Sequence, residues 1–222
     1  MMQLELDAGE GEPEALWPLI DALAIACGGH VGDDASMGRA LAACARRGLI
    51  AGAHPAYVDR EGFGRRTIAV APHVLADQIH DQCAALARLA VDHGIAIAFA
   101  KPHGALYHDA ARDPAIAEAV VSAVIRALGE VAIIGPSWGA TNALRDAALA
   151  RGLRYLREGF ADRALRPDGS LVPRGEPGAV LEDPAAAVAQ ARALVDRVDT
   201  LCIHGDSPNA LAIARAVRAA LG

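Results

Sequence analysis

The stretch Ile95-Ala96-Ile97-Ala98-Phe99-Ala100-Lys101-Pro102-His103-Gly104 joins an apolar run to a polar end. A short apolar run bounded by proline and glycine is typical of a buried strand. Similar runs recur along the chain and alternate with segments of helical period, a pattern that indicates βα units and a parallel sheet. The predicted strands are Gln3–Asp7, Leu23–Cys27, Leu49–Ala53, Ile95–Lys101, Val131–Gly135, Leu153–Arg157 and Thr200–His204.

The segments between these strands carry helix start signals. Asp113-Pro114, Asp183-Pro184 and Ser207-Pro208 each pair a capping residue with proline at the first helical position, where a missing N–H costs nothing. A longer helix is predicted from about Pro72 to His93, and Gly94 ends it. We expect a single domain over residues 1–222, either an open doubly wound sheet or a closed barrel, because periodicity alone does not separate the two.

The composition excludes several classes of protein. Of the 222 residues, 53% are hydrophobic, which is enough for one sizeable core. The net charge of −6 argues against a nucleic-acid partner, since phosphate binding needs clustered lysine and arginine. The chain opens without a basic leader and has no apolar stretch of membrane-spanning length, so we expect a cytoplasmic protein. Its four cysteines form no CxxC pair, which excludes a zinc ribbon.

Polar residues gather where the predicted strands end. In a parallel barrel these ends share one face, and catalytic groups gather there. Lys101 is the only lysine among 21 basic residues, which indicates a position that needs a compact ammonium. A cation beside proton-transfer groups suits the stabilisation of developing negative charge. The predicted catalytic residues are Lys101, His103, His54 and Glu158.

Other polar side chains at the strand ends and in the loops that follow are expected to contact a substrate. Arginine forks at such positions could clamp a carboxylate or a phosphate. The predicted substrate-binding residues are Asp7, His30, Asp33, Arg65, Tyr107, Asp162, Arg163, Arg174, His204 and Asp206.

The glycine-rich stretch before Asp33 raises the question of a nucleotide or a metal. It lacks GxGxxG spacing, and the chain lacks GxxxxGK[ST], so no Walker-type nucleotide site is predicted. His30 with Asp33 or Asp34 could instead bind a divalent metal, together with Asp7 or His54. No fixed spacing supports this set, so a metal stays open, with Asp7, His30 and His54 as its candidate ligands.

Five motifs together point to a known family. They are Gly52–Pro55, Lys101–Tyr107, Glu158–Arg163, Leu171–Arg174 and Cys202–Asp206. In this order and over nearly the whole chain, they resemble the LamB/YcsF family, which is the family of the 5-oxoprolinase A-subunit. The resemblance implies an irregular seven-stranded (β/α) barrel of the glycoside hydrolase/deacetylase-like kind.

The resemblance also implies an activity, which is the ATP-dependent opening of 5-oxoproline to glutamate together with partner B and C subunits. It implies ATP, with Mg, as a cosubstrate and a small lactam as the substrate. Because the chain has no Walker motif, ATP would use another kind of site or meet one of the partner subunits. Association of copies of this chain with one another is left open.

The first two predicted strands depart from the family pattern. The chain opens with Glu5–Gly9, reading Glu-Leu-Asp-Ala-Gly where the family usually has Asp-Leu-Asn-x-Asp. Ala24–His30 likewise replaces Asn-Ile-Ala-Cys-Gly-Phe-His. These changes predict altered contacts there, and the substrate could be another lactam or amide. Two further hypotheses stay open: a non-catalytic or regulatory subunit, and a metal-dependent deacetylase-like amidase.

Overall fold

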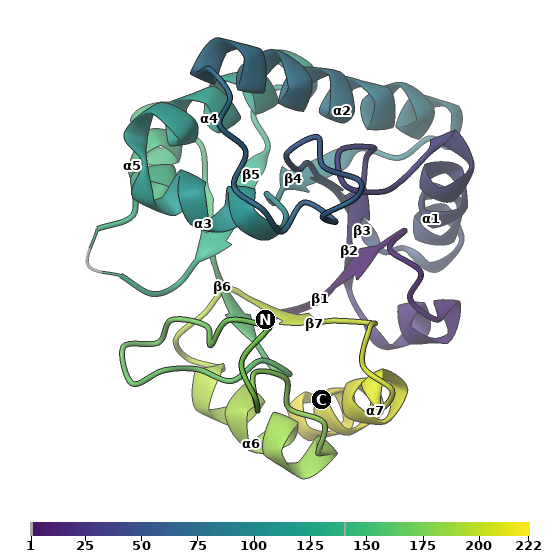
Figure 1. The fold of residues 1–222 in the computed structure, drawn as a ribbon. Coiled ribbons are helices and arrows are strands. Elements are labelled where there is room, and N and C mark those ends of the chain that lie inside the picture. Colours follow the sequence, from purple (N-terminus) through teal and green to yellow (C-terminus); the bar gives the residue numbers. More distant parts are fainter. Residues whose placement is uncertain (1, 140) are drawn as a thin grey trace.

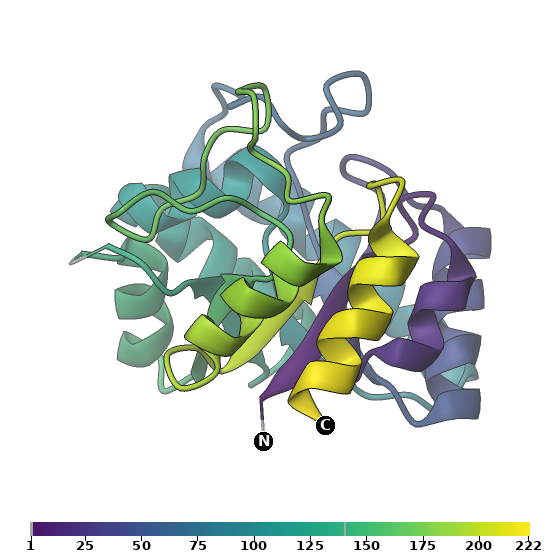
Figure 2. The ribbon, with the colours of Figure 1, turned by 90° about the horizontal axis from the view of Figure 1, so that it is seen from below.

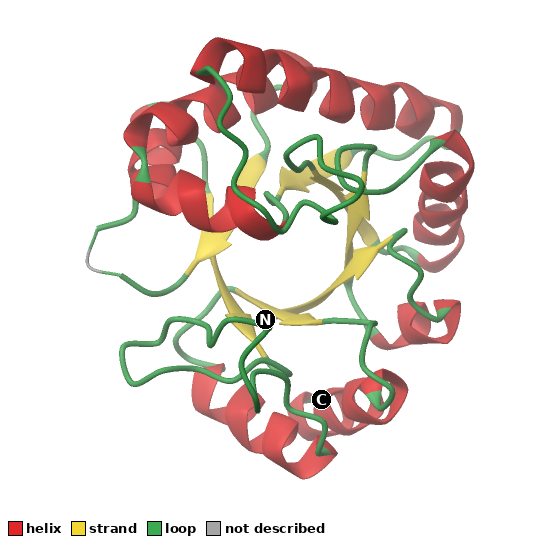
Figure 3. Ribbon diagram, viewed as in Figure 1, coloured by secondary structure: helices red, strands yellow, loops and turns green. Residues whose placement is uncertain are grey.

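The computed structural model describes residues 2–139 and 141–222. Within them, seven parallel strands close into a barrel in sequence order, and β7 pairs with β1 to complete it (Figure 3). The strands are β1 (Gln3–Ala8), β2 (Ala22–Ala26), β3 (Ile50–His54), β4 (Ile97–Ala100), β5 (Ala132–Pro136), β6 (Tyr155–Phe160) and β7 (Thr200–Ile203). All seven predicted strands are confirmed, with ends that differ by up to three residues, and the sheet is the closed barrel.

The helices form an outer ring around this barrel (Figure 1). They are η1 (Glu14–Leu19), α1 (Asp34–Arg47), α2 (Pro72–Asp92), α3 (Gly104–Arg112), α4 (Pro114–Leu128), α5 (Ala143–Ala150), α6 (Pro184–Leu194) and α7 (Ala210–Leu221). Across the described part of the chain, no helix combines the length and the apolar character that crossing a membrane requires.

Two of the three predicted helix starts are confirmed. The side chains of Asp113 and Asp183 accept hydrogen bonds from backbone N–H groups of the first turns of α4 and α6. The third is wrong, because α7 begins only at Ala210 and Ser207 Oγ instead accepts from Asn209 N in the preceding turn. The long helix α2 matches its prediction, and Gly94 follows it with a φ of 64°.

Alternation along the strands sorts side chains between two environments. On β1, Leu4 and Leu6 point outward into the main core between sheet and helices, whereas Glu5 and Asp7 point into the barrel. The apolar part of the interior is small and contains Phe99, packed with Ala22, Ala24 and Ile134. A Cβ on Gly52 would lie 2.1 Å from the Phe99 ring, so only glycine fits beside it. The remaining interior, toward the carboxyl ends of the strands, is polar.

Two long loops rise above that polar end. Residues 55–71 follow β3 and residues 161–183 follow β6, and both stand on the face of the barrel opposite the chain termini (Figure 2). Long loops in compact domains are commonly functional. Their position places them over the carboxyl ends of the strands, where barrel proteins hold their sites.

Candidate active site

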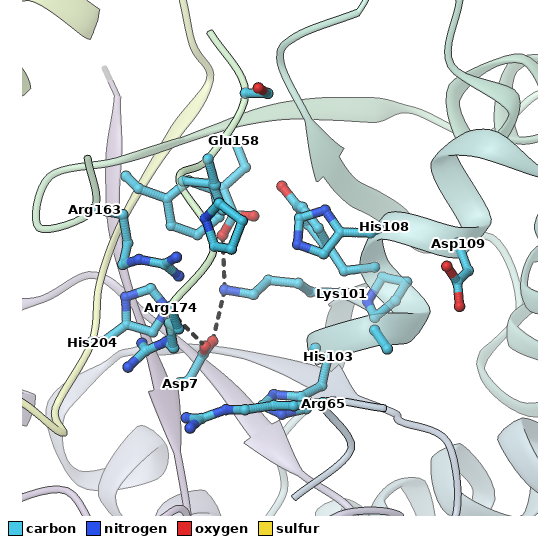
Figure 4. Close-up of a pocket in the computed structure, with 18 of the residues that line it drawn as sticks. Asp7, Arg65, Lys101, His103, His108, Asp109, Glu158, Arg163, Arg174 and His204 are labelled. Atoms are coloured by element: carbon cyan, nitrogen blue, oxygen red, sulfur yellow. Dashed lines mark hydrogen bonds and ion pairs between the residues drawn. The ribbon is translucent and has the colours of Figure 1, made fainter. Parts of the chain in front are cut away.

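Lys101, just after β4, is the centre of a buried ion cluster. Its ammonium lies 2.7 Å from Asp7 Oδ1 and 2.7 Å from Glu158 Oε1, and it also contacts Glu5. Figure 4 shows the lysine side chain extending across the cavity between Glu158 and Asp7. We refer to Glu5, Asp7, Lys101 and Glu158 as the Lys101 cluster. It joins β1, β4 and β6 across the inside of the barrel.

Burial and charge set the protonation states in this cluster. Burial alone would lower the pKa of Lys101, but the surrounding carboxylates, Asp7 first among them, hold it well above its ordinary value. Burial raises the pKa of Glu5 to about 7, and the nearby carboxylates add to the effect against the pull of Lys101. The carboxylates therefore favour the charged form of Lys101, whereas burial favours the protonated form of Glu5.

Three histidines and a glutamate form a second cluster beside the first. Glu10 Oε1 lies 2.7 Å from His30 Nε2, 3.1 Å from His103 Nδ1 and 3.6 Å from His54 Nε2. His54 Nε2 and His103 Nδ1 are 3.0 Å apart. We refer to Glu10, His30, His54 and His103 as the histidine cluster. Burial lowers the pKa of His30 to about 4. It also disfavours charge on His54, but Asp7 outweighs it and raises the pKa of His54 to about 9.

His204, after β7, forms a pair with Asp162, after β6. His204 Nδ1 lies 3.0 Å from Asp162 Oδ1, and the backbone N–H of His204 donates to Asp162 Oδ2 at 2.7 Å. The ring stacks on Phe160 with its centroid 5.7 Å away. His204 Nε2 points toward Asp7, 3.9 Å from its Oδ2. An acceptor on Nδ1 fixes the ring and leaves Nε2 for proton transfer.

These groups surround a cavity of about 430 Å³ at the mouth of the barrel. Arginines from the two long loops and from the end of α3 line it, namely Arg65, Arg163, Arg166 and Arg174 from the loops and Arg112 from the helix. Arg163 is held by its bonds to the carbonyls of Ala179 and Val172, at 3.2 and 2.7 Å. Asp206 at the rim pairs with Arg65 and Arg174. The cavity thus offers a cationic wall suited to a carboxylate or a phosphate.

Tyr107 and Glu158 line this cavity, and each has a buried polar atom without a hydrogen-bond partner among the described residues. These atoms are Tyr107 OH and Glu158 Oε2. Because an unpaired buried polar group is costly, such a pair indicates a place for ligand atoms.

The structure brings together most of the predicted site residues. The four predicted catalytic residues all line the cavity, as do Asp7, Arg65, Tyr107, Arg163, Arg174 and His204. His30 lies behind Glu10, Asp162 lies behind His204, and Asp206 lines a small adjoining cavity. Asp33, which was also predicted to bind substrate, lies outside this cavity, where it is exposed and caps α1 by accepting a hydrogen bond from Ser36 N. Of the candidate metal ligands, His30 and His54 share Glu10, and Asp7 lies 3.5 Å from His54 Nε2 while it also pairs with Lys101.

Several residues of the site were not predicted. They are Glu5, Glu10, His108, Trp138 and Phe160. Period-two alternation could have found Glu5, since it shares a face of β1 with Asp7. Glu10 had no such signal, because it lies in the turn after β1, between two glycines with positive φ.

A closed parallel (β/α) barrel with an ionisable cavity at the carboxyl ends of its strands has the architecture of a barrel enzyme. The model of the LamB/YcsF family matches residues 4–222, and the chain belongs to this family. Its relatives include proteins named as the A-subunit of 5-oxoprolinase. The one from Methylococcus capsulatus is 42% identical and the match covers 98% of this chain and 90% of that protein. The one from Symbiobacterium thermophilum is 41% identical, with 99% and 91% covered.

A solved structure agrees with the fold over nearly its whole length. The crystal structure of a lactam utilization protein from Thermus thermophilus superposes with a TM-score of 0.89 at 33% identity, covering 99% of this chain and 95% of that chain. This chain and the Thermus thermophilus protein therefore share the same fold.

Proposed function

We propose that this chain is the substrate-binding and catalytic subunit for ATP-dependent opening of 5-oxoproline to glutamate, acting with partner B and C subunits. The observation that carries the proposal is that Tyr107 and Glu158, which both line the cavity, each have a polar atom without a hydrogen-bond partner among the described residues. Tyr107 OH can donate to a lactam carbonyl, while Glu158 Oε2 can accept from a lactam N–H. The arginine wall would bind the ring carboxylate or the phosphates of ATP. The names of the relatives support the same reaction.

The reaction needs ATP because an unstrained five-membered lactam does not open readily. Transfer of the γ-phosphoryl group to the lactam oxygen would make the ring carbon electrophilic. Water then adds to that carbon, the C–N bond breaks, and the ring nitrogen takes a proton. The resulting acyl phosphate is hydrolysed by a second water to glutamate and phosphate. Lys101 stabilises the charge on the transferred group, since it remains a cation throughout.

The remaining groups divide the proton transfers and the attack by water. The pair of His204 and Asp162 would protonate the leaving ring nitrogen from Nε2. Glu10, His54 and His103 of the histidine cluster line the same cavity as Lys101. They would position the attacking water. A purely regulatory subunit fits less well, because it has no use for buried polar atoms left without partners.

The test is an assay of the complex with homologues of the B and C subunits, supplied with 5-oxoproline and Mg-ATP. We expect release of glutamate and phosphate that depends on 5-oxoproline. Tyr107→Phe should lower kcat/KM about 10-fold, the loss of one hydrogen bond to substrate, and it should leave folding intact because the hydroxyl makes no bond within the described chain. An assembled wild-type complex without this turnover, or an unchanged kcat/KM in Tyr107→Phe, would contradict the proposal.

A further inference from the structure

Two backbone carbonyls fix the tautomers of the histidine cluster. His54 Nδ1 lies 2.7 Å from Lys101 O, and His103 Nε2 lies 3.0 Å from Phe63 O. A carbonyl oxygen can only accept, so both of these nitrogens carry hydrogen. In a neutral imidazole the other nitrogen then presents a lone pair. The lone pairs of His54 Nε2 and His103 Nδ1 therefore face each other across 3.0 Å, an arrangement that requires a cation or a proton between them.

The backbone at Phe63 keeps one of these carbonyls in place. Phe63 has a φ of 55°, a left-handed conformation that bulky residues rarely adopt. Its ring packs edge-on against His30 and His103, with centroids 5.2 and 5.6 Å away. Strained backbone of this kind tends to occur at functional sites, where the surrounding structure maintains it. Here the conformation directs the carbonyl to His103 Nε2.

The spacing of the ligand atoms fits a metal ion. Oxygen or nitrogen ligands at ~2.0–2.1 Å from a tetrahedral ion lie about 3.3 Å from one another. Among Glu10, His54 and His103 the three separations are 3.0, 3.1 and 3.6 Å. All candidate ligand atoms of the histidine cluster lie within 4.8 Å of one another. The converging atoms are thus close to a coordination shell before any side chain moves.

His30 has a different role from the other two histidines. Its ring is stacked on His103, with centroids 3.7 Å apart and an angle of 2° between the planes. Two imidazoles stacked in this way do not both direct an in-plane nitrogen at one ion. His30 Nε2 lies instead 2.7 Å from Glu10 Oε1, where it can hold the carboxylate in position. This leaves one carboxylate and two imidazoles as ligands.

The charges around the two clusters are consistent with a dication. Buried charges need compensation. Among the described residues, Glu10 has only histidines as ion-pair partners, because the ammonium of Lys101 contacts Asp7 and Glu158 instead. A divalent ion bound beside Glu10 would supply positive charge next to this carboxylate.

We propose that Glu10, His54 and His103 bind a divalent metal ion, with His30 positioning Glu10 and the open coordination positions facing the cavity. Two imidazoles and a carboxylate suit Zn²⁺ and the other first-row ions that prefer imidazole. An ion there would provide Lewis-acid activation of the attacking water. The proposal rests on ligand geometry and not on the identity of the substrate.

The test is metal binding by the isolated chain, with no lactam, ATP or partner present, so its outcome is separate from that of the proposed function. The protein is stripped with a chelator, dialysed, and titrated with Zn²⁺ and with Co²⁺, whose visible absorption reports the ligand geometry. We expect one equivalent bound per chain. His54→Ala and Glu10→Gln should each lower the affinity at least about 100-fold, because each removes a direct ligand. Exposed His73→Ala is the matched control and should bind as the wild type does.

Glu10→Gln keeps the size of the side chain and an acceptor for His30, so we expect this variant to fold even if His54→Ala does not. Circular dichroism checks the folding of both variants. Absence of binding by the folded wild type would overturn the proposal and leave a proton on His54 as the charge between the histidines. Equal binding by wild type and folded Glu10→Gln would also overturn it, because the ion would then be elsewhere.

Discussion

The Lys101 cluster and the histidine cluster lie side by side at the mouth of one barrel, yet their charges are balanced differently. In the Lys101 cluster one ammonium contacts three carboxylates, so anions are in excess around a cation that the chain itself provides. In the histidine cluster lone pairs converge, and the cation must come from a proton or a bound ion. The positive charge of the Lys101 cluster is therefore part of the fold, whereas the positive charge of the histidine cluster is acquired by binding a proton or an ion.

Breaking the Lys101 cluster should have the largest effect. Lys101→Met keeps the length of the side chain but leaves Glu5, Asp7 and Glu158 buried without their cation. We expect a loss of about 3–5 kcal/mol in the free energy of unfolding, measured with urea. Adding Glu5→Gln to Lys101→Met should restore part of it. Arg88→Met, which breaks an exposed pair with Asp34, is the control and should change stability little. Similar losses in both single variants would refute a special role for the buried cluster.

Measuring the free energy of unfolding at several pH values tests the carboxylates of the Lys101 cluster. The pKa of Glu5 is raised in the folded chain to about 7, from an ordinary value of 4.5. The folded state therefore holds this proton more tightly, and the stabilisation is complete below pH 4.5 and is lost as the pH rises through 7. The Glu5 carboxyl group is faced by four residues, which are Lys101, Asp7, Glu158 and Thr200.

Glu5→Gln removes this titration. Relative to wild type, the variant should gain up to about 3 kcal/mol in unfolding free energy between pH 4.5 and pH 7.5, as measured by urea unfolding at each pH. A difference between the two proteins that stays constant over this range would show that Glu5 keeps an ordinary pKa.

The smallest effect is expected outside both clusters. Asp33 caps α1 and does not reach the cavity. Asp33→Ala should lower Tm by about 2–4 °C, the loss of one helix cap in a chain of this size. Turnover by the complex and metal binding by the chain should stay at wild-type levels. A fall in turnover without a fall in Tm would restore Asp33 to the substrate-binding residues.

Much of the barrel and part of the site could be predicted from the sequence. Lys101, Glu158 and His204 were predicted because each follows an apolar run, and the carboxyl ends of parallel strands meet on one face. Closure of the sheet could not be predicted from periodicity, since an open sheet has the same alternation of strands and helices. The role of Asp33 as the cap of α1 was not predicted, although Ser36 follows it at capping-box spacing, a local signal of a helix start.

The first strand shows why the rest was missed. Because Gly9 replaces an aspartate of the family pattern, the sequence predicted the loss of a carboxylate at this place. The next residue, Glu10, provides a carboxylate that contacts His30, His54 and His103. Its direction depends on the turn formed by Gly9 and Gly11, whose φ angles are 81° and 97°. A loop residue of this kind has no periodicity from which its direction could be inferred.

The most direct test of the account is 5-oxoproline turnover by the assembled complex with wild-type or Lys101→Met chain. We expect the wild-type complex to release glutamate and phosphate in equal amounts. Because Lys101 is the cation that the reaction uses, the Lys101→Met complex should still assemble but release both products at least about 10³-fold more slowly. Equal rates from the two complexes would contradict the account, because the reaction would then not use the cation at the centre of the barrel.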